Sequence, residues 1–210
     1  MTSPILLPII GVLLAAGRGT RFDPSGVQDK LQQPLPDGDK VAVAAARTML
    51  AVLSDVIAVV RVENAVAASL RALGCTVVVC EDADRGMGAS LACALRQAVD
   101  ASGWVIALGD MPYVLPTTIA ALRDALMDGA DIAVPVRNGR RGNPVGFGRE
   151  RLPQLLQVEG DQGARALLHA NPWTAVEVDD QGIHHDIDSP ADLEGEWNNA
   201  PDNSLPRKRL

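Results

Sequence analysis

The chain has 210 residues, 47% of them hydrophobic and 3% aromatic, with a formal net charge of −7. This length accommodates one sizeable domain, and we expect a single domain over residues 1–197 followed by a polar, disordered tail over 198–210. The negative charge argues against a general nucleic-acid-binding protein, and the scarcity of aromatic side chains argues against platforms for stacking bases.

The cysteines and the N-terminal segment indicate where the protein works. Cys75, Cys80 and Cys93 are odd in number and lack the C-x-x-C spacing of zinc sites, so we expect buried thiols in a reducing cytoplasm. The apolar run over residues 5–16 is too short to cross a bilayer and lacks the basic start of a signal peptide. We therefore expect a soluble, cytoplasmic protein that does not contact membranes.

Strand-like and helix-like segments alternate along the chain. Strands are expected at 5–16, 55–61, 76–80, 104–108 and 131–136. Helices are expected between them at 41–53, 63–73, 89–101 and 116–127. Beyond residue 137 the rhythm is looser, with expected helices at 149–156, 163–170 and 191–197 and short strands at 175–178 and 183–187. The alternation predicts a three-layer α/β/α, Rossmann-like fold with helices on both faces of a mostly parallel sheet.

In such sheets the ligand binds outside the carboxyl ends of the strands. This rule ranks three loops above the others, namely 16–30, 81–90 and 109–112. Each of them contains glycines, charges or a hydroxyl group that packing alone does not require. We therefore expect the functional site where these three loops meet.

The first loop has the composition of a phosphate-binding turn. Gly17 and Gly19 allow the backbone to approach an anion and to adopt positive φ. Arg18, Arg21 and Lys30 add fixed positive charge in an otherwise acidic protein. Glycines after a strand can also serve only to turn the chain, but the cations favour a phosphate site, with Lys30 contacting a transferring or leaving phosphate.

Two common nucleotide-binding motifs are excluded for this loop. The dinucleotide fingerprint requires a third glycine where Phe22 stands, and an acidic residue at the end of the second strand, which instead ends in Arg61. The loop also lacks the pattern of a P-loop. It is therefore expected to be a phosphate loop of another kind.

Asp110 follows an apolar strand, between Gly109 and Pro112. A carboxylate at the end of a buried strand is costly unless it is paired or binds a metal. Capping of the next helix is the alternative, but that helix is expected to begin near Pro116. Because hard oxygen ligands and substrate phosphates together suit Mg²⁺, we interpret Asp110 as a magnesium ligand.

Ser90 lies at the start of an expected helix, where free backbone N–H groups can bind an anion. Two other interpretations compete with this one. Ser90 can be a simple capping residue, or residues 88–92 can form the nucleophile elbow of a hydrolase, with His184 or His185 as the base. The hydrolase interpretation leaves the cation-rich first loop unexplained.

Six segments together resemble the motif series of the MobA/MocA-like nucleotidyltransferases. They are residues 14–22 with Asp29 and Lys30, then 86–91, 108–112, 139–147, 160–165 and 186–193. The series covers residues 9–195 and its combination is specific for the family, although the first motif also occurs in sugar-phosphate nucleotidyltransferases. The double alanine before Gly17 resembles the CTP-using, MocA-like branch, whereas a glycine in place of Ala16 would suit the GTP-using branch better.

The resemblance implies a fold like that of the nucleotide-diphospho-sugar transferases and a Mg²⁺-dependent enzyme. Such an enzyme transfers a nucleoside monophosphate from an NTP, here CTP, to a phosphorylated acceptor and releases pyrophosphate. Molybdopterin, with its terminal phosphate, is the best-known acceptor of the family, and a molybdoenzyme is an implied partner. In this chemistry the protein positions an in-line attack and offsets charge, without a covalent nucleophile.

The resemblance also implies roles for particular residues. Those bordering the base and ribose would be Leu14, Ala15, Ala16 and Gly17, with Ser90 also on the nucleotide. Those on the triphosphate would be Gly19, Arg21 and Lys30, of which Arg21 and Lys30 would be catalytic together with Asp110, the Mg²⁺ ligand. Asp186 or Asp188 would be a second metal or acceptor contact, and the acceptor side would be lined by Arg141, Asn143 and Pro144.

Two departures from the family pattern affect these assignments. The loop over 23–29 is longer than the usual spacer, which bears on how far Lys30 reaches. Asn143 stands where a histidine is common, which bears on the identity of the acceptor. Three alternatives to a molybdopterin cytidylyltransferase remain. They are a same-fold enzyme using GTP or another NTP and a different acceptor, a non-catalytic nucleotide- or cofactor-binding accessory protein of a molybdoenzyme, and a serine hydrolase.

Overall fold

The computed structural model describes residues 7–161 and 163–194. Among these residues, eight strands form one sheet. The strands are β1 (Ile9–Ala15), β2 (Val56–Val60), β3 (Thr76–Val79), β4 (Gly103–Leu108), β5 (Ile132–Arg137), β6 (Arg140–Arg141), β7 (Val145–Gly148) and β8 (Thr174–Glu177). Their order is β3-β2-β1-β4-β7-β5-β6, and β8 pairs with β5 beside this path. The tail expected over 198–210 lies outside the described residues.

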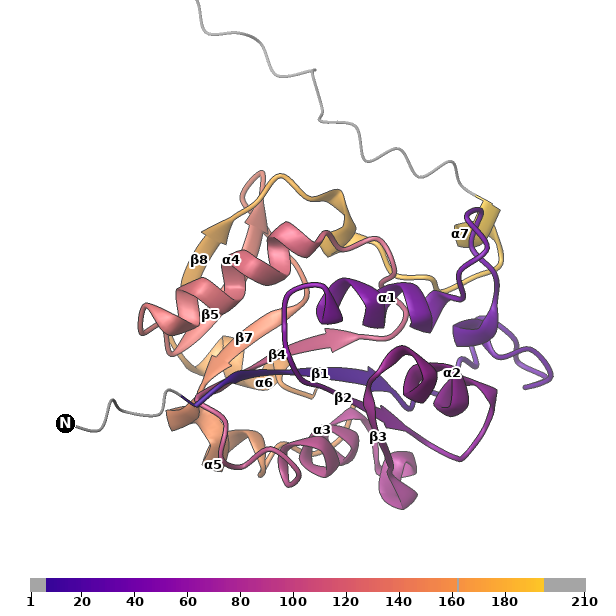
Figure 1. The fold of residues 1–210 in the computed structure, drawn as a ribbon, viewed down its shortest axis with the longest axis horizontal. Helices are drawn as coiled ribbons and strands as arrows, with labels where there is room; N and C mark the ends of the chain where they lie inside the picture. The colour runs from indigo at the N-terminus through magenta and orange to yellow at the C-terminus, as the bar shows by residue number, and fades with distance from the viewer. Residues whose placement is uncertain (1–6, 162, 195–210) are drawn as a thin grey trace, which may run out of the picture.

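Helices cover both faces of this sheet (Figure 1). They are α1 (Val41–Leu50), α2 (Ala65–Leu73), α3 (Met87–Leu95), α4 (Pro116–Met127), α5 (Leu152–Leu155), α6 (Arg165–Ala170) and α7 (Ala191–Glu194). Short 3-10 segments are η1 (Lys30–Gln32), η2 (Glu81–Arg85), η3 (Arg149–Arg151) and η4 (Gln181–His184). Residues of α1, α2 and α4 belong to one apolar core cluster, and those of α3, α5 and α6 to a second. The expected three-layer α/β/α, Rossmann-like fold is confirmed.

The first four strands form the parallel half of the sheet. β1 pairs in parallel with β2 on one side and with β4 on the other, and β3 continues beyond β2. Leu13 lies in register with Ala58 and Ala107, and all three are buried. Burial on both faces explains why β1, β2 and β4 read as near-continuous apolar runs. The carboxyl ends of these strands meet at one edge of the sheet, where the expected site loops leave it.

The other half of the sheet is mixed. β7 lies antiparallel between β4 and β5, while β8 is parallel to β5. The sequence predicted neither β6 nor β7, because residues 138–148 contain four glycines and a proline. At Gly146 a Cβ atom would lie 3.1 Å from Leu126 Cδ1, so the packing of α4 leaves little room for a side chain there. Gly146 weakens the strand pattern in the sequence, and the close packing of α4 explains why a glycine stands there.

The prediction of a strand at 183–187 is wrong. The segment begins in η4 and continues as irregular backbone. Its hydrogen bonds go to loops of the site edge, since the N–H of Asn143 donates to Ile183 O (2.9 Å) and the N–H of Ile187 donates to Asp110 O (2.8 Å). The apolar residues that suggested a strand are Ile183 and Ile187, which are buried against the core.

The helices differ from the sequence expectations mainly at their ends. The helix expected at 116–127 is confirmed, with a proline in its first turn. The helix expected at 63–73 begins at Ala65 and ends before Gly74, whose φ of +110° is the left-handed cap that glycine favours. The helix expected at 89–101 begins two residues earlier and ends at Leu95. None of the helices in the described ranges is both long and apolar enough to span a bilayer.

Candidate active site

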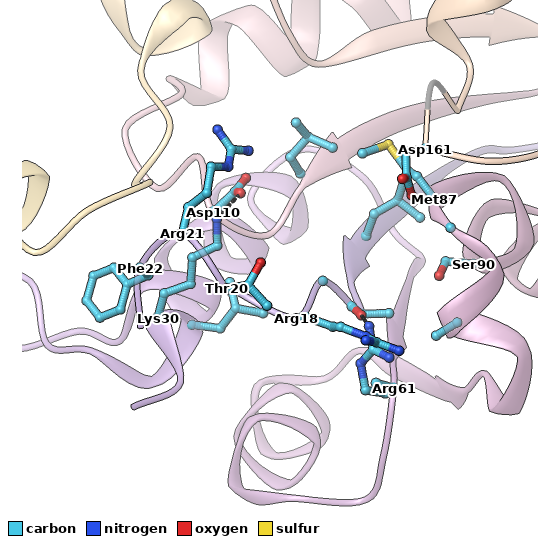
Figure 2. Close-up of a pocket in the computed structure, with 18 of the residues that line it drawn as sticks. Arg18, Thr20, Arg21, Phe22, Lys30, Arg61, Met87, Ser90, Asp110 and Asp161 are labelled. Carbon is cyan, nitrogen blue, oxygen red and sulfur yellow. Dashed lines mark hydrogen bonds and ion pairs between the residues drawn. The ribbon is translucent and has the colours of Figure 1, made fainter. Parts of the chain in front are cut away.

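A cavity of about 630 Å³ opens at the carboxyl edge of the parallel strands. It is lined by the loop after β1, the end of β2, η2 with the start of α3, the loop after β4, and two later segments around 161–165 and 186–188. In Figure 2, Arg21, Phe22 and Lys30 lie on one side of it and Met87, Ser90 and Asp161 on the other. The three loops ranked by the sequence therefore surround one cleft, as expected from the sheet topology.

The loop after β1 forms the floor of the cleft. Gly19 has a φ of +64°, and its carbonyl accepts a hydrogen bond from the N–H of Phe22 (2.9 Å), which closes a turn. Phe22 is buried and anchors this turn in the core. Leu14, Ala16, Gly17 and Gly19 line the cavity, whereas Ala15 faces away and packs against Gly109.

The longer loop over 23–29 has its own internal order. The Asp23 carboxylate accepts hydrogen bonds from the N–H of Ser25 (2.8 Å), the hydroxyl of Ser25 (2.6 Å) and the N–H of Gln28 (2.7 Å). The hydroxyl and backbone donors lower the pKa of Asp23 to about 2. Asp29 then caps η1 by accepting from Leu31 N. The longer loop is thus internally hydrogen-bonded, and the residue after Asp29 lines the cleft.

That residue is Lys30, whose side chain is only 12% exposed. Its Nζ donates to Asp110 Oδ2 at 2.6 Å, to the carbonyl of Ile187 at 3.0 Å and to Asp188 Oδ1 at 3.4 Å. Arg21 forms a second ion pair with Asp188. The two catalytic cations and two of the metal-binding aspartates expected from the sequence are therefore neighbours across the cleft, despite separations of up to 167 positions along the chain.

The carboxylates of this cluster fit a divalent cation that also binds substrate phosphates. The Oδ1 atom of Asp110 is buried and has no hydrogen-bond partner among the described residues. Asp186 also lines the cavity, but no group of three His, Cys, Asp or Glu side chains within the described ranges is arranged to hold a metal ion on its own. Magnesium is commonly held by one or two carboxylates with phosphate oxygens and water completing its shell. Asp110 with Asp188 or Asp186 matches that requirement.

The charge balance of the cleft also favours a bound divalent cation. Five basic and five acidic side chains line the cavity in the described part of the chain, so their formal charges cancel. A nucleoside triphosphate carries several negative charges, and the whole protein is acidic. An added divalent cation would supply the attraction that the lining itself lacks.

Sequence reasoning missed a second charged cluster beside the first loop. Arg61, at the end of β2, donates from Nη2 to the carbonyl of Ala16 (2.8 Å) and forms an ion pair with Asp84. Arg18 binds the same carboxylate with Nη2 at 2.9 Å. Burial, and then the charge of Arg18, lower the pKa of Arg61. Arg61 was visible in the sequence as the charged end of an apolar strand, but it served only to exclude a dinucleotide site.

The start of α3 differs from the free anion site expected there. Ser90 is buried and lines the cavity. However, the N–H of Gly88 donates to the carbonyl of Gly160 (3.0 Å), so part of the helix terminus is satisfied by the chain itself. The three histidines of the chain, all described, are absent from the cavity lining. Ser90 therefore has no histidine beside it in the cleft, and a hydrolase triad is not assembled.

The residues expected to bind the acceptor lie away from the cavity. Arg141 is exposed on β6, with Nη2 3.5 Å from His169 Nε2. Asn143 binds the backbone of Ile183 and precedes a cis peptide bond to Pro144. Pro144 contributes instead to a small apolar pocket beneath α4. Asp161 and Arg165, which lie in the motif segment 160–165 but were given no role from the sequence, line the cavity instead.

Comparison with known proteins gives consistent results. Residues 11–176 match the model of the MobA-like NTP transferase domain. The purine catabolism protein PucB of Bacillus subtilis (strain 168) is 32% identical over 211 residues, covering 92% of this chain and 97% of PucB. The nicotine blue oxidoreductase of Paenarthrobacter nicotinovorans is 31% identical, covering 86% and 92% of the two chains.

Solved structures agree with these sequence matches. The crystal structure of Rv0371c from Mycobacterium tuberculosis H37Rv matches with a TM-score of 0.73 and 29% identity, covering 90% of this chain and 99% of that one. Both the family match and the relatives above 30% identity extend over most of the chain. The protein belongs to the MobA-like NTP transferase family and is by family a nucleotidyltransferase.

Proposed function

We propose that this protein transfers CMP from CTP to a phosphorylated acceptor of the molybdopterin type in the cytoplasm, with Mg²⁺ and with release of pyrophosphate. The observation that carries the proposal is the cluster in which Lys30 Nζ lies 2.6 Å from Asp110 Oδ2, beside Asp188 and above the glycine turn of residues 17–21. It combines an anion-binding loop, cations and carboxylates in one cleft.

The side chains of this cluster match the needs of nucleotidyl transfer. The acceptor phosphate oxygen would attack the α-phosphorus in line, while Lys30 and Arg21 stabilise the charge that develops on departing pyrophosphate. Asp110, with Asp188 or Asp186, would hold the Mg²⁺, which supplies charge neutralisation at the phosphate oxygens when bound. Lys30 would have to leave Asp110 and bind the phosphates. Nucleotide binding would therefore free the Asp110 carboxylate for the metal.

The nucleotide would lie along the carboxyl end of β1. Leu14, Ala16 and Gly17 border the cavity on one side and Ser90 on the other. The choice of CTP rests on the double alanine before Gly17, which resembles the CTP-using branch of the family. The choice of Mg²⁺ rests on the hard oxygen ligands; Rv0371c has also been solved as a complex with manganese.

Measurement of pyrophosphate release tests the proposal. The wild-type protein is assayed with CTP, GTP, ATP and UTP, each with and without molybdopterin, in the presence of Mg²⁺. We expect release with CTP that depends on molybdopterin. Release with GTP or without molybdopterin would favour a related transferase with another nucleotide or acceptor, and NTP binding without release would favour an accessory protein of a molybdoenzyme. Labelling of Ser90 by a fluorophosphonate would support the hydrolase alternative.

A further inference from the structure

Arg165 differs from the other cations of the cleft. Four of the five basic side chains in the cavity lining form ion pairs, namely Arg18 and Arg61 with Asp84, Arg21 with Asp188, and Lys30 with Asp110 and Asp188. For Arg165, the residues described in the structure provide no carboxylate partner. Its side chain is exposed to the cleft at the first residue of α6. Arg165 is thus a cation that needs no rearrangement before it binds an anion.

Residues 158–161, which precede Arg165 in the chain, are fitted closely against α3. A Cβ atom on Gly88 would lie 2.4 Å from Val158 O, and a Cβ atom on Gly86 would lie 2.6 Å from Gly160 C. The hydrogen bond from Gly88 N to Gly160 O closes the contact. Any side chain at these two glycines would push the loop away. The glycines at the start of α3 therefore permit a close backbone approach that holds residues 158–161, and with them Asp161, at the cleft.

Asp161 belongs to the same loop and faces the same cavity. In Figure 2 it lies with Met87 on the side of the cleft away from Lys30. Its Oδ1 atom would be 2.8 Å from a Cβ atom on Gly86, a residue whose φ is +107°. Gly86 thus adopts a conformation that other residues avoid and leaves space that Asp161 uses.

We propose that Arg165, the first residue of α6, binds the phosphate group of the acceptor. This inference rests on the proposed function for its biological meaning. Lys30, Arg21 and the metal ligands would serve the triphosphate, so the acceptor phosphate requires a cation of its own, and Arg165 is available. A guanidinium binds phosphate with paired N–H donors. Asp161 lines the same cavity and can accept hydrogen bonds, so the acceptor would be a phosphomonoester that also carries N–H or O–H groups.

A binding experiment with inorganic phosphate tests the site without turnover. Phosphate is titrated calorimetrically into nucleotide-free wild-type protein, Arg165→Met and Arg96→Met. Arg96 is a matched control because it is an exposed arginine at the far end of α3, outside the cavity. We expect the affinity for phosphate to fall about 10- to 100-fold in Arg165→Met and to stay unchanged in Arg96→Met. No phosphate binding by the wild type, or equal affinities in wild type and Arg165→Met, would overturn the proposal.

Steady-state kinetics of pyrophosphate release separate the two substrates. We expect Arg165→Met to raise KM for the acceptor about 10- to 100-fold while KM for CTP stays nearly constant, and Arg165→Lys to recover part of the loss. A raised KM for CTP in place of the acceptor would assign Arg165 to the nucleotide and reject the proposal. If the wild type releases no pyrophosphate with any substrate pair, the proposed function fails, and the phosphate titration still decides the site at Arg165.

Discussion

Lys30 Nζ lies 2.6 Å from Asp110 Oδ2, although the two residues are 80 positions apart. The lysine comes from η1 and the aspartate from the end of β4, and both side chains are mostly shielded from water. In the structure the ammonium group thus neutralises the carboxylate that we expect to bind Mg²⁺. Binding of Mg²⁺ and a triphosphate would replace this ion pair with two others, lysine to phosphate and carboxylate to metal.

Replacement of either partner should abolish transfer without unfolding the protein. We expect Lys30→Ala and Asp110→Ala to lower pyrophosphate release by at least about 10²- to 10³-fold, because each removes an electrostatic contact that strengthens as charge develops in the transition state. Far-ultraviolet circular dichroism and a thermal melt check the fold of each variant. Wild-type turnover in either variant would refute the roles assigned to both.

Although replacement of Lys30 should abolish transfer, it should strengthen metal binding. With no nucleotide present, Lys30 competes with a cation for Asp110 and Asp188, so Lys30→Met should bind Mn²⁺ more tightly than the wild type does. Electron paramagnetic resonance of free Mn²⁺ measures this affinity directly. Arg96→Met again serves as the control for loss of one positive charge. Equal or weaker Mn²⁺ binding in Lys30→Met would show that the two carboxylates do not form the metal site.

Gly88→Ala should destabilise the protein by about 1–3 kcal/mol, because its new Cβ atom would overlap the carbonyl oxygen of Val158. Urea denaturation followed by circular dichroism measures the free energy of unfolding. Gly17→Ala is the matched control, since a Cβ atom there meets nothing within 4 Å. Similar stabilities of the two variants would contradict the close contact between α3 and the 158–161 loop.

Asp180 is a buried carboxylate that should contribute to stability. It is 1% exposed and accepts hydrogen bonds from the N–H of Leu115 (2.8 Å), the hydroxyl of Thr118 (2.7 Å) and the N–H of Gly182 (2.8 Å). Asp180→Ala would leave these donors unpaired and should lower the free energy of unfolding by about 2–4 kcal/mol.

The neighbouring Asp179 provides the comparison for that measurement. Its side chain is 67% exposed and forms a surface ion pair with Arg137. Asp179→Ala should change the free energy of unfolding by less than about 1 kcal/mol. If the two aspartate variants lost equal stability, the hydrogen bonds of Asp180 would not explain its effect.

The cysteines should differ in reactivity. Burial raises the pKa of Cys75 to about 11, and burial together with the nearby Cys93 raises the pKa of Cys80 to about 11. At about pH 8 both would remain protonated and unreactive, since the thiolate is the nucleophile. Cys93 is only partly buried. We expect one rapidly reacting thiol with Ellman's reagent in the native protein and none in Cys93→Ser.

The sequence predicted most of the parallel half of the fold and three loops of the cleft. This half is encoded locally, as apolar strands alternate with capped helices, and α4 matches its expected range at both ends. The rule that ligands bind at the carboxyl ends of parallel strands predicted that the loops of Lys30, Ser90 and Asp110 meet, and all three residues line one cavity.

The remaining features depend on contacts between distant segments. β7 is short and glycine-rich, and as a strand it is held by pairing with β4 and β5 and by the packing of α4. Likewise, residues 160–165 were among the segments that resemble the family, but only the fold shows that Arg165 lines the cleft. Arg61 was the exception, since its position at the end of β2 was available from the sequence.

The backbone of Ile187 joins both members of the central ion pair, since its carbonyl accepts from Lys30 Nζ and its N–H donates to Asp110 O. The match to the family model, by contrast, ends at residue 176. Residues 186–188 thus lie beyond the matched region, and a shift of this one backbone segment would disturb the lysine and the aspartate of the ion pair together.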